Sequence, residues 1–303
     1  AINRASIAKQ LLPGLNAVFG IEYGEVADEY SVLYEVENSD RAFEEEVLFT
    51  GFGEAPVKGE GAAVQYDNAQ ESYTSRYTAE TVALAFSVTE EAMEDNLYDT
   101  FAKLRARGLA RSMASTKQTK AAQTFNQGFA AAVTGGDGQP MFSASHPTVG
   151  DGSQSNLIGT TGTVDLSEAA LETALVSIQT LKDDRGILIG AGAVSLHVAP
   201  SNQFTADRVL NSPYQSNTAD NNINSINHQG MLPSGYMVNK RFSDPDAFFI
   251  KTDVPNGAKM FIRAPLATKM EPDFDTGNLR FKARERYSFG WSDWRGYFGS
   301  QGA

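Results

Sequence analysis

The sequence predicts an α+β fold in which a long hairpin and a very long helix accompany a mixed body of helices and strands. Strand-like alternation and helix-like periodicity occur in separate runs along the 303 residues, and no internal repeat is visible. Glycines punctuate residues 41–80 between aromatic and β-branched residues. No proline occurs between Thr89 and Pro140. These three observations support the prediction.

The chain begins with a predicted helix that is followed by a predicted strand. Apolar residues recur at helical spacing over residues 5–19, but Pro13-Gly14 is expected to break that helix or divide it into two pieces. A mobile docking arm and an ordinary first core helix both fit this pattern. Residues 29–37 alternate between Tyr or Val and other side chains, which predicts a strand.

Residues 41–80 predict a hairpin that projects from the body. Its glycines suit turns and sharp bends between strands. The stretch around Gly53 to Gly61 is too polar to bury a core of its own, and an isolated two-stranded hairpin is only marginally stable. We therefore expect this segment to need a neighbouring chain.

A strand over residues 80–88 leads into a helix predicted over residues 89–130, with Thr89 as its N-cap. Acidic residues occupy its first turns and only basic ones follow over 103–120, an order that the helix dipole favours. Such a helix would be about 63 Å long, whereas a compact globule of this chain length is about 50 Å across. We therefore expect a flat or elongated molecule.

The basic residues of the long helix are interpreted as a solvated face or as partners for acids on a neighbouring chain. They are Lys103, Arg105, Arg107, Arg111, Lys117 and Lys120.

The second half of the chain predicts shorter elements. Residues 165–182 fit a helix with Asp165 or Ser167 near its cap, and another short helix contains Phe204 and Leu210. An Asn-rich loop is expected over residues 217–227. Strands are predicted at residues 194–198, 236–242, 246–252, 258–264 and 279–287, the last with Arg or Lys alternating with apolar residues.

Composition excludes several functional classes. The 25 Lys and Arg against 37 Asp and Glu give a net charge of −12, so the whole molecule is not expected to coat nucleic acid. Cysteine is absent, which removes disulfides, thiolate chemistry and cysteine-rich zinc sites. No apolar stretch approaches the roughly 18 to 20 residues that span a bilayer, so no membrane partner is expected.

No catalytic, cofactor-binding or metal-binding residue is assigned, no cofactor is expected, and the chain is predicted not to be an enzyme. His146, His197 and His228 are widely separated and lack metal-ligand spacing. His197 is interpreted as a core residue. His146 is interpreted as a turn residue rather than half of a Ser/His pair, because no Gly-x-Ser-x-Gly elbow accompanies it.

Two alternatives of a different class stay open. Glu271, Asp273 and Asp275 offer the oxygen ligands that calcium prefers, without the spacing of an EF-hand loop. Two carboxylates with Trp291 and Trp294 stacking on a sugar would instead suit a soluble carboxylate-dependent hydrolase.

The order of segments and several short motifs point to a known family. Arm, hairpin, very long helix, central α/β region and returning C-terminal strand follow one another over nearly the whole chain. This order resembles the major capsid proteins of tailed bacteriophages, which share the Hong Kong 97 fold. Similar stretches, especially in the Mu-type head subunit group, are residues 12–16 (LPGLN), 49–53 (FTGFG), 141–147 (MFSASHP) and 284–299, which include YSFG and DWRG.

The resemblance implies a division of the chain into the parts of that fold. Residues 1–28 would be the N-terminal arm and 41–80 the extended E-loop. Residues 29–40, 81–162 and 263–303 would form the P-domain, with a spine helix over about 89–130. Residues 163–262 would form the A-domain.

The resemblance also implies the function and the partners. The chain would be a major capsid (head) protein that self-assembles into the hexamers and pentamers of an icosahedral shell. Portal, scaffolding and cement proteins would be its partners, and double-stranded DNA would be enclosed rather than specifically bound. The location would be the virion, after assembly in the bacterial cytoplasm. An encapsulin-like nanocompartment shell is the alternative with the same fold.

Overall fold

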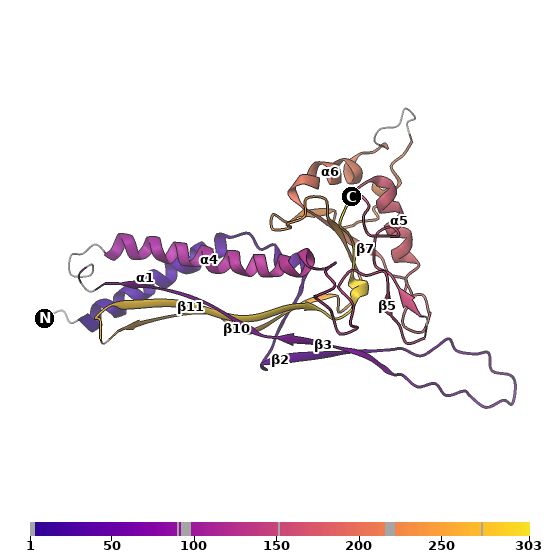
Figure 1. The fold of residues 1–303 in the computed structure, drawn as a ribbon, viewed down its shortest axis with the longest axis horizontal. Helices are drawn as coiled ribbons and strands as arrows, with labels where there is room; N and C mark the ends of the chain where they lie inside the picture. The colour runs from indigo at the N-terminus through magenta and orange to yellow at the C-terminus, as the bar shows by residue number, and fades with distance from the viewer. Residues whose placement is uncertain (1–3, 90, 92–97, 151, 216–221, 274) are drawn as a thin grey trace.

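A long sheet with two helices on one face forms the main layer of the molecule (Figure 1). The computed structural model describes residues 4–89, 91, 98–150, 152–215, 222–273 and 275–303. Within these residues the sheet has four strands in the order β1–β10–β11–β4, with β1 parallel to β10 and the other pairs antiparallel. The strands are β1 (Glu35–Asn38), β10 (Ala258–Pro272), β11 (Leu279–Trp291) and β4 (Glu80–Val88).

Helices α1 (Arg4–Glu25) and α4 (Tyr98–Asn126) cover one face of this sheet. Because side chains alternate along a strand, Phe281 and Ala283 of β11 face these helices and are buried. They share a core with Leu15 and Phe19 of α1 and with Ala and Leu side chains of α4. The opposite face of β11 is polar and exposed.

The prediction that Pro13-Gly14 breaks the first helix is wrong. Helix α1 is one element of 22 residues that passes through both. Proline removes one backbone hydrogen bond, but burial of Leu15 and Phe19 against α4 and the sheet offsets that loss. Of the two interpretations of this segment, the structure therefore favours a core helix.

The long helix is confirmed but shorter than predicted. Helix α4 has 29 residues, or about 44 Å at about 1.5 Å per residue. It ends at Asn126 rather than near 130, where Gly128 lies in a turn against Phe142. Thr89 is not helical, and the predicted first turns at 90 and 92–97 lie outside the described residues.

Residues 29–37 are only partly the strand that was predicted. Helix α2 (Tyr30–Leu33) takes the first half and β1 the second. Asp28 accepts a hydrogen bond from the backbone N–H of Ser31, and Lys251 donates to the carbonyl of Val32. The local Asp28 contact and the tertiary Lys251 contact together stabilise a helical turn where the alternation favoured an extended chain.

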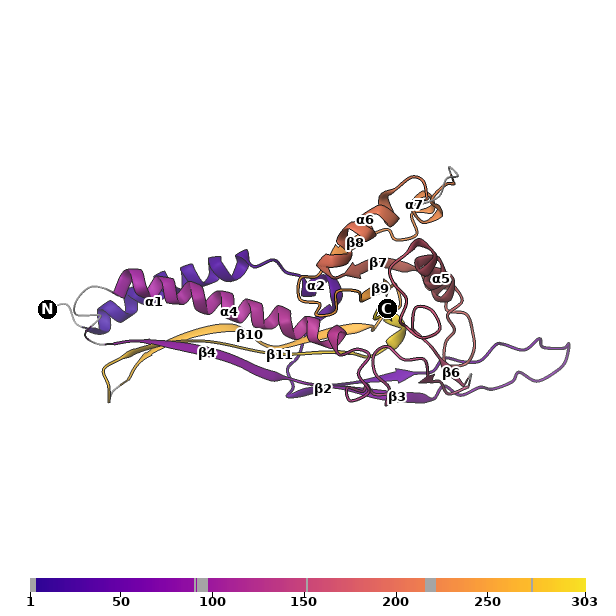
Figure 2. The same cartoon turned by 45° about the horizontal axis from the view of Figure 1, so that its top comes forward.

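The predicted hairpin is confirmed. Strands β2 (Phe43–Phe49) and β3 (Glu71–Thr78) pair in antiparallel register on the side of the long sheet away from α1 and α4. The loop between them, residues 50–70 (the hairpin loop), extends past the end of the body (Figure 2). The molecule is elongated, as the sequence predicted.

A second sheet and three helices form a second lobe beside the long sheet. Over the described part of the chain its strand order is β12–β9–β7–β8. Leucine, isoleucine and phenylalanine side chains from this sheet and α5 build its core. The strands are β7 (Ala193–Val198), β8 (Tyr236–Val238), β9 (Phe248–Thr252) and β12 (Tyr297–Ser300), and the helices are α5 (Glu168–Gln179), α6 (Gln203–Asn211) and α7 (Ser225–Gln229).

Three predictions for this half need correction. Residues 225–229 are helical rather than loop, because the Asn224 side chain caps α7. The strand predicted at residues 236–242 is shorter, because β8 ends at Val238, where it pairs with β7. The chain end splits between the sheets: β11 joins the long sheet as expected, whereas β12 pairs with β9 of the second lobe.

The two sheets meet at a junction rich in aromatic side chains. Phe125, Phe142, Phe249 and Tyr297 pack edge to face, tilted or stacked, with ring centroids 4.9–6.4 Å apart. Short elements complete this region. They are β5 (His146–Pro147), β6 (Ser153–Gln154) and the 3₁₀ turns Pro200–Asn202 and Trp294–Gly296.

Candidate assembly surfaces

The hairpin loop exposes large apolar side chains to solvent. Val57 is fully exposed, Tyr66 is 96% exposed, and Phe52 and Val64 are more than half exposed. Burying one such side chain contributes about 1.5–3 kcal/mol. Within the subunit this free energy is not gained, so the loop is a candidate surface for contact with another chain.

A charged contact joins the hairpin loop to the second lobe. The Arg185 guanidinium donates to both carboxylate oxygens of Asp67, at 2.9 and 3.0 Å. The backbone N–H of Gly53 also donates to Asp67, at 2.8 Å. The Gly53 hydrogen bond and the Arg185 charge hold the pKa of Asp67 below its usual value. The loop is thus held against the turn that follows α5.

A partly buried polar network fixes the base of the hairpin on the long sheet. Lys259 of β10 lies 2.5 Å from Glu46 and 3.1 Å from Glu37. Glu46 also accepts from the Ser292 hydroxyl, which lies 2.5 Å from the Tyr77 hydroxyl. Burial alone would lower the pKa of Lys259, but the hydrogen bonds to the two carboxylates raise it, so the ammonium stays charged.

The hairpin also meets the turn after α4 at very close range. A Cβ atom added to Gly136 would lie 2.5 Å from the backbone oxygen of Thr74 in β3. Only glycine permits this approach of two backbones. The hairpin is therefore fixed to the body at its base, its middle and its loop.

His146 is buried, not a turn residue as predicted. Its Nδ1 lies 2.6 Å from Asp137 and its Nε2 lies 3.1 Å from the Asn156 side chain. The ring stacks on Trp294 at 4.4 Å. Both nitrogens are engaged by an acid and an amide, so His146 is placed as a structural residue rather than beside a serine nucleophile.

His197 is a core residue, as predicted. It is buried in β7, where its Nε2 lies 2.9 Å from the Ser195 hydroxyl. Burial, together with the charge of Lys251, lowers the pKa of His197 to about 3. The ring is neutral at physiological pH. His228 is exposed on α7.

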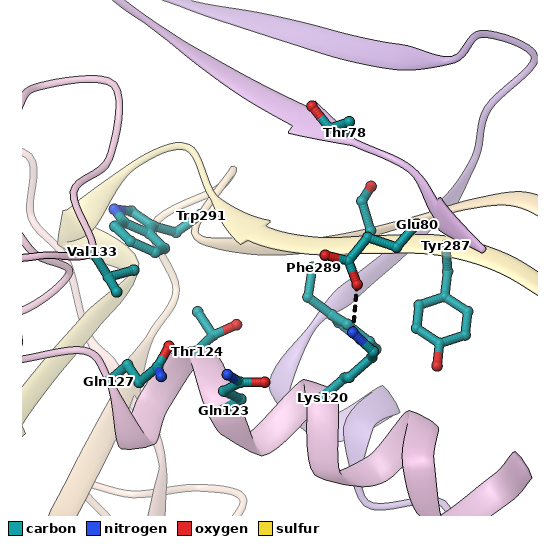
Figure 3. A pocket seen from close by; sticks show the side chains of 11 residues that line it. Thr78, Glu80, Lys120, Gln123, Thr124, Gln127, Val133, Tyr287, Phe289 and Trp291 are labelled. Carbon is teal, nitrogen blue, oxygen red and sulfur yellow. Dashed lines mark hydrogen bonds and ion pairs between the residues drawn. The ribbon is translucent and has the colours of Figure 1, made fainter. Parts of the chain in front are cut away.

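A cavity of about 300 Å³ lies between α4, the strand β11 and the base of the hairpin (Figure 3). Gln123 and Thr124 of α4, and Gln127 directly after it, face Tyr287 and Trp291 of β11 across it. The Glu80 and Lys120 at its rim form an ion pair with each other. The cavity offers neutral hydrogen-bonding groups and aromatic edges, a lining suited to a polypeptide segment rather than to acid–base chemistry.

Several basic residues of α4 pair with acids of their own chain, an arrangement that the sequence analysis did not consider. Glu22 of α1 contacts both Arg107 and Arg111. Lys117 lies 3.3 Å from the buried Glu285 of β11. These contacts fasten α4 to α1 and to the sheet beneath it.

The residues proposed for calcium or sugar binding have other contacts. Glu271 pairs with Lys269, and Asp273 accepts from Arg280 at 2.5 Å. The side chain of Trp294 is fully buried, which leaves no face for a sugar. Across the described residues, no group of three or more His, Asp or Glu side chains is placed to hold a metal ion. In the same residues, no helix combines the length and apolarity needed to cross a membrane.

Sequence reasoning missed the contacts that position the hairpin. Asp67 and Arg185 are 118 residues apart, and Glu46 and Lys259 are 213 apart. Each is an ordinary charged residue in its local stretch, so periodicity and spacing gave no indication of the pairing. The available indication was that Lys259 stands directly before the apolar run Met260-Phe261-Ile262.

Comparison with known proteins identifies the family to which the chain belongs. A sequence model described as phage capsid protein matches residues 71–298, well over half of the chain. The chain belongs to the phage capsid protein family. No curated protein matches it. This family is structural, so the capsid protein is not an enzyme; it is a major capsid protein that forms the icosahedral shell of a phage head in the virion.

Solved shells share the fold at low sequence identity. The capsid of an empty GTA particle aligns at 15% identity and a TM-score of 0.55, with 90% of each chain covered. The procapsid of bacteriophage JBD30 aligns at 13% identity with a TM-score of 0.53, and the alignment covers 99% of this chain and 76% of the other. A virus-like particle from Pyrococcus furiosus aligns at 10% identity with a TM-score of 0.52, and the alignment covers 95% of this chain and 98% of the other. The expected Hong Kong 97 fold of this capsid protein is confirmed.

Proposed function

We propose that the shell is built from hexamers and pentamers whose subunits are joined through the hairpin loop. The observation that carries this proposal is the set of large apolar side chains, Val57 and Tyr66 above all, held in solvent by a loop that is itself fixed to the body. A loop that is held in place and apolar loses little conformational entropy when a neighbour covers it.

The boundaries between the parts of the shell fold are assigned from the two sheets. We assign residues 1–28 as the N-terminal arm, 41–80 as the E-loop, and 29–40, 81–162 and 263–296 as the P-domain. The A-domain comprises residues 163–262 and, because β12 pairs with β9, the strand Tyr297–Ser300. Packing of α1 on α4 of the same chain supports a role for the arm within its own subunit.

The remaining partners follow from the function. Portal, scaffolding and cement proteins would complete the head, and double-stranded DNA would be enclosed without a specific binding site. The net charge of −12 supports this last point, because an acidic wall does not retain phosphate. The short stretches at residues 12–16 and 49–53 support the Mu-type group.

A nanocompartment shell is the second candidate, favoured by the fold similarity to a virus-like particle. The two kinds of shell differ in what they enclose. Shells purified from the native source would carry nuclease-protected double-stranded DNA in a phage head and a cargo enzyme in a compartment.

The test replaces residues 54–64 by a short Gly-Ser linker. Gly53 and Asp67 stay in place, so the loop base and its contact with Arg185 are kept. We expect a subunit with unchanged circular dichroism that forms no closed shells in negative-stain electron microscopy. A full-length variant with Lys240→Ala, an exposed position on the second lobe, is the control and should assemble. Closed shells from the linker variant would contradict the proposal.

A further inference from the structure

We infer that the buried His146 carries a proton on both ring nitrogens in the folded subunit, and that the resulting imidazolium connects the second lobe to the turn after α4. This connection between the two lobes is expected to weaken as the pH rises. The inference concerns the subunit alone, so it does not depend on the proposed function. It starts from a histidine whose side chain is fully buried between an acid and an amide.

The orientation of the Asn156 side chain decides what the Nε2 atom of His146 can do. The NH2 group of Asn156 faces three backbone carbonyls at 2.7–3.2 Å, which belong to Met141, Trp294 and Tyr297. Turning the amide over would place its oxygen against these three oxygens, so the NH2 group stays where it is. The Asn156 oxygen accepts from the backbone N–H of Ser143 and lies 3.1 Å from Nε2. Because this oxygen accepts and cannot donate, Nε2 carries a proton.

A second acceptor faces the other nitrogen of the same ring. The Nδ1 atom of His146 lies 2.6 Å from Oδ2 of Asp137, whose side chain is 2% exposed. The Oδ1 atom of Asp137 accepts from the backbone N–H of Gln139 at 3.1 Å. A neutral imidazole has one N–H and satisfies only one of its two acceptors. Since imidazole is a far stronger base than a carboxylate, the additional proton lies on the ring.

The charges around the ring favour a cation at this position. The titratable groups packed there are Tyr73 of β3, Asp137, Asp184, Asp293 and Arg295. Burial raises the pKa of Tyr73, and the charges of Asp293 and Asp137 raise it further, so the phenol is neutral. Three carboxylates therefore face one guanidinium among the described residues of this cluster. An imidazolium supplies the second positive charge.

The imidazolium joins segments from both lobes. Asp137 lies in the turn after α4, whereas Trp294 belongs to the core of the second lobe. The His146 ring stacks on the Trp294 indole, with the centroids 4.4 Å apart and the planes 4° apart, and a cation on an indole face is attracted by it. Loss of the ring proton would leave two acceptors facing each other, at either Asp137 or Asn156. One side of the connection would then have to open, because a buried acceptor without a donor is costly.

NMR of the full, unassembled chain with isotope-labelled histidine tests the protonation directly. The chain has three histidines, and the signals that His146→Gln removes belong to His146. At pH 7.5 we expect His146 to show two ring N–H protons and the nitrogen chemical shifts of an imidazolium. His197, whose pKa is lowered to about 3, should show a neutral ring in the same spectrum. A neutral ring at His146 would overturn the inference, and this measurement needs only wild-type protein to fold.

Asp137→Asn is the matched variant, because an amide can donate to Nδ1 where the carboxylate only accepts. The ring can then be neutral, with its proton on Nε2, and keep both hydrogen bonds. We expect this variant to lose the Nδ1–H signal and to keep the Nε2–H signal. Asp40→Asn removes a charge at an exposed position before β2 and should retain both signals. Two ring N–H signals in Asp137→Asn would show that the carboxylate does not hold the proton, which overturns the inference.

The additional proton also determines how the folded subunit responds to rising pH. A folded state that binds one more proton than the unfolded chain loses up to about tenfold in its folding equilibrium constant for each pH unit. Urea unfolding of the unassembled chain between pH 7 and pH 9 should show this fall in wild type and in Asp40→Asn, and a smaller fall in Asp137→Asn. Equal slopes in all three proteins would overturn the inference.

Hydrogen exchange tests whether the proton maintains the connection. The backbone N–H of Ser143 donates to Asn156 and should be protected from exchange while the connection is closed. After correction for the intrinsic increase of exchange with pH, this protection should fall between pH 7 and pH 9 in wild type and stay constant in Asp137→Asn. Constant protection of Ser143 in wild type would show that the imidazolium does not connect the lobes, which overturns that part of the inference.

Discussion

Arg185, in the turn after α5, holds Asp67 of the hairpin loop through two hydrogen bonds of 2.9 and 3.0 Å. This contact links the projecting loop to the second lobe, whereas Lys259 and Glu46 link the base of the hairpin to the long sheet. The direction of the hairpin is therefore fixed by both lobes of its own subunit before any neighbour binds.

Removing the contact between Arg185 and Asp67 should loosen the hairpin loop without unfolding the subunit. We expect Arg185→Gln to increase the rate of limited proteolysis within residues 50–70 at neutral pH several-fold. Because the pKa of Asp67 is lowered, its carboxylate keeps this contact down to below the usual Asp range, and wild-type loop protection is lost only as the pH falls through that lowered pKa. Arg208→Gln, on the exposed side of α6, should leave the cleavage rate unchanged. Equal cleavage of Arg185→Gln and wild type would contradict this role.

Removing Lys259 should destabilise the subunit strongly. Lys259→Ala leaves Glu46, whose side chain is 24% exposed, without its cation, and the loss of a hydrogen bond to a charged partner costs about 1.5–3 kcal/mol. Urea unfolding of the unassembled chain measures the change in the free energy of unfolding. Lys240→Ala, at an exposed position, should stay within about 0.5 kcal/mol of wild type. A loss below 1 kcal/mol for Lys259→Ala would mean that the pair does not hold the hairpin base.

His197 should make the subunit sensitive to mild acid. Its folded pKa of about 3 lies below the usual histidine value of 6.5, so the unfolded chain binds the extra proton first and the free energy of unfolding falls as the pH drops below about 6.5. Between pH 7 and pH 5 this one group should lower the free energy of unfolding by about 2 kcal/mol. His197→Gln removes the titration, so its loss over the same interval should be smaller by that amount. If the free energy of unfolding fell equally with pH in both proteins, His197 would not be the group responsible for the acid sensitivity.

Replacing two glycines by alanine should change the stability of the subunit in opposite directions. Gly108 lies inside α4 with open space around its Cα, so Gly108→Ala should stabilise the subunit by about 0.5–1 kcal/mol through helix propensity. Gly136→Ala places a methyl group against the backbone of Thr74, which costs about 1–3 kcal/mol. Thermal unfolding monitored by circular dichroism ranks the two against wild type. Stabilisation by both substitutions would show that the close approach at Gly136 is not required.

Features that depend on local pattern were predictable from the sequence. The alternation in residues 80–88, the glycines of the hairpin and the proline-free run to Pro140 identified β4, the β2–β3 pair and α4. The order of these segments was enough to indicate the shell fold, and the match to phage capsid proteins confirmed it.

Features that depend on distant partners were not predictable. The helix through Pro13, the helical turn at Tyr30 and the burial of His146 each contradict the local pattern. Each depends on contacts with elements far along the chain, which for His146 is the stacking on Trp294.

The sequence by itself determined the kinds of elements and their order, because turn preference and hydrophobic periodicity act over a few residues. Only the tertiary structure decided which charges are satisfied inside the subunit and which remain for a neighbour. Glu22 and Glu285 look no different in sequence from Glu54 and Glu60, yet the first two face basic residues of α4 and the last two face solvent. Ion pairing depends on distances of a few ångströms that the fold sets between residues far apart in the chain.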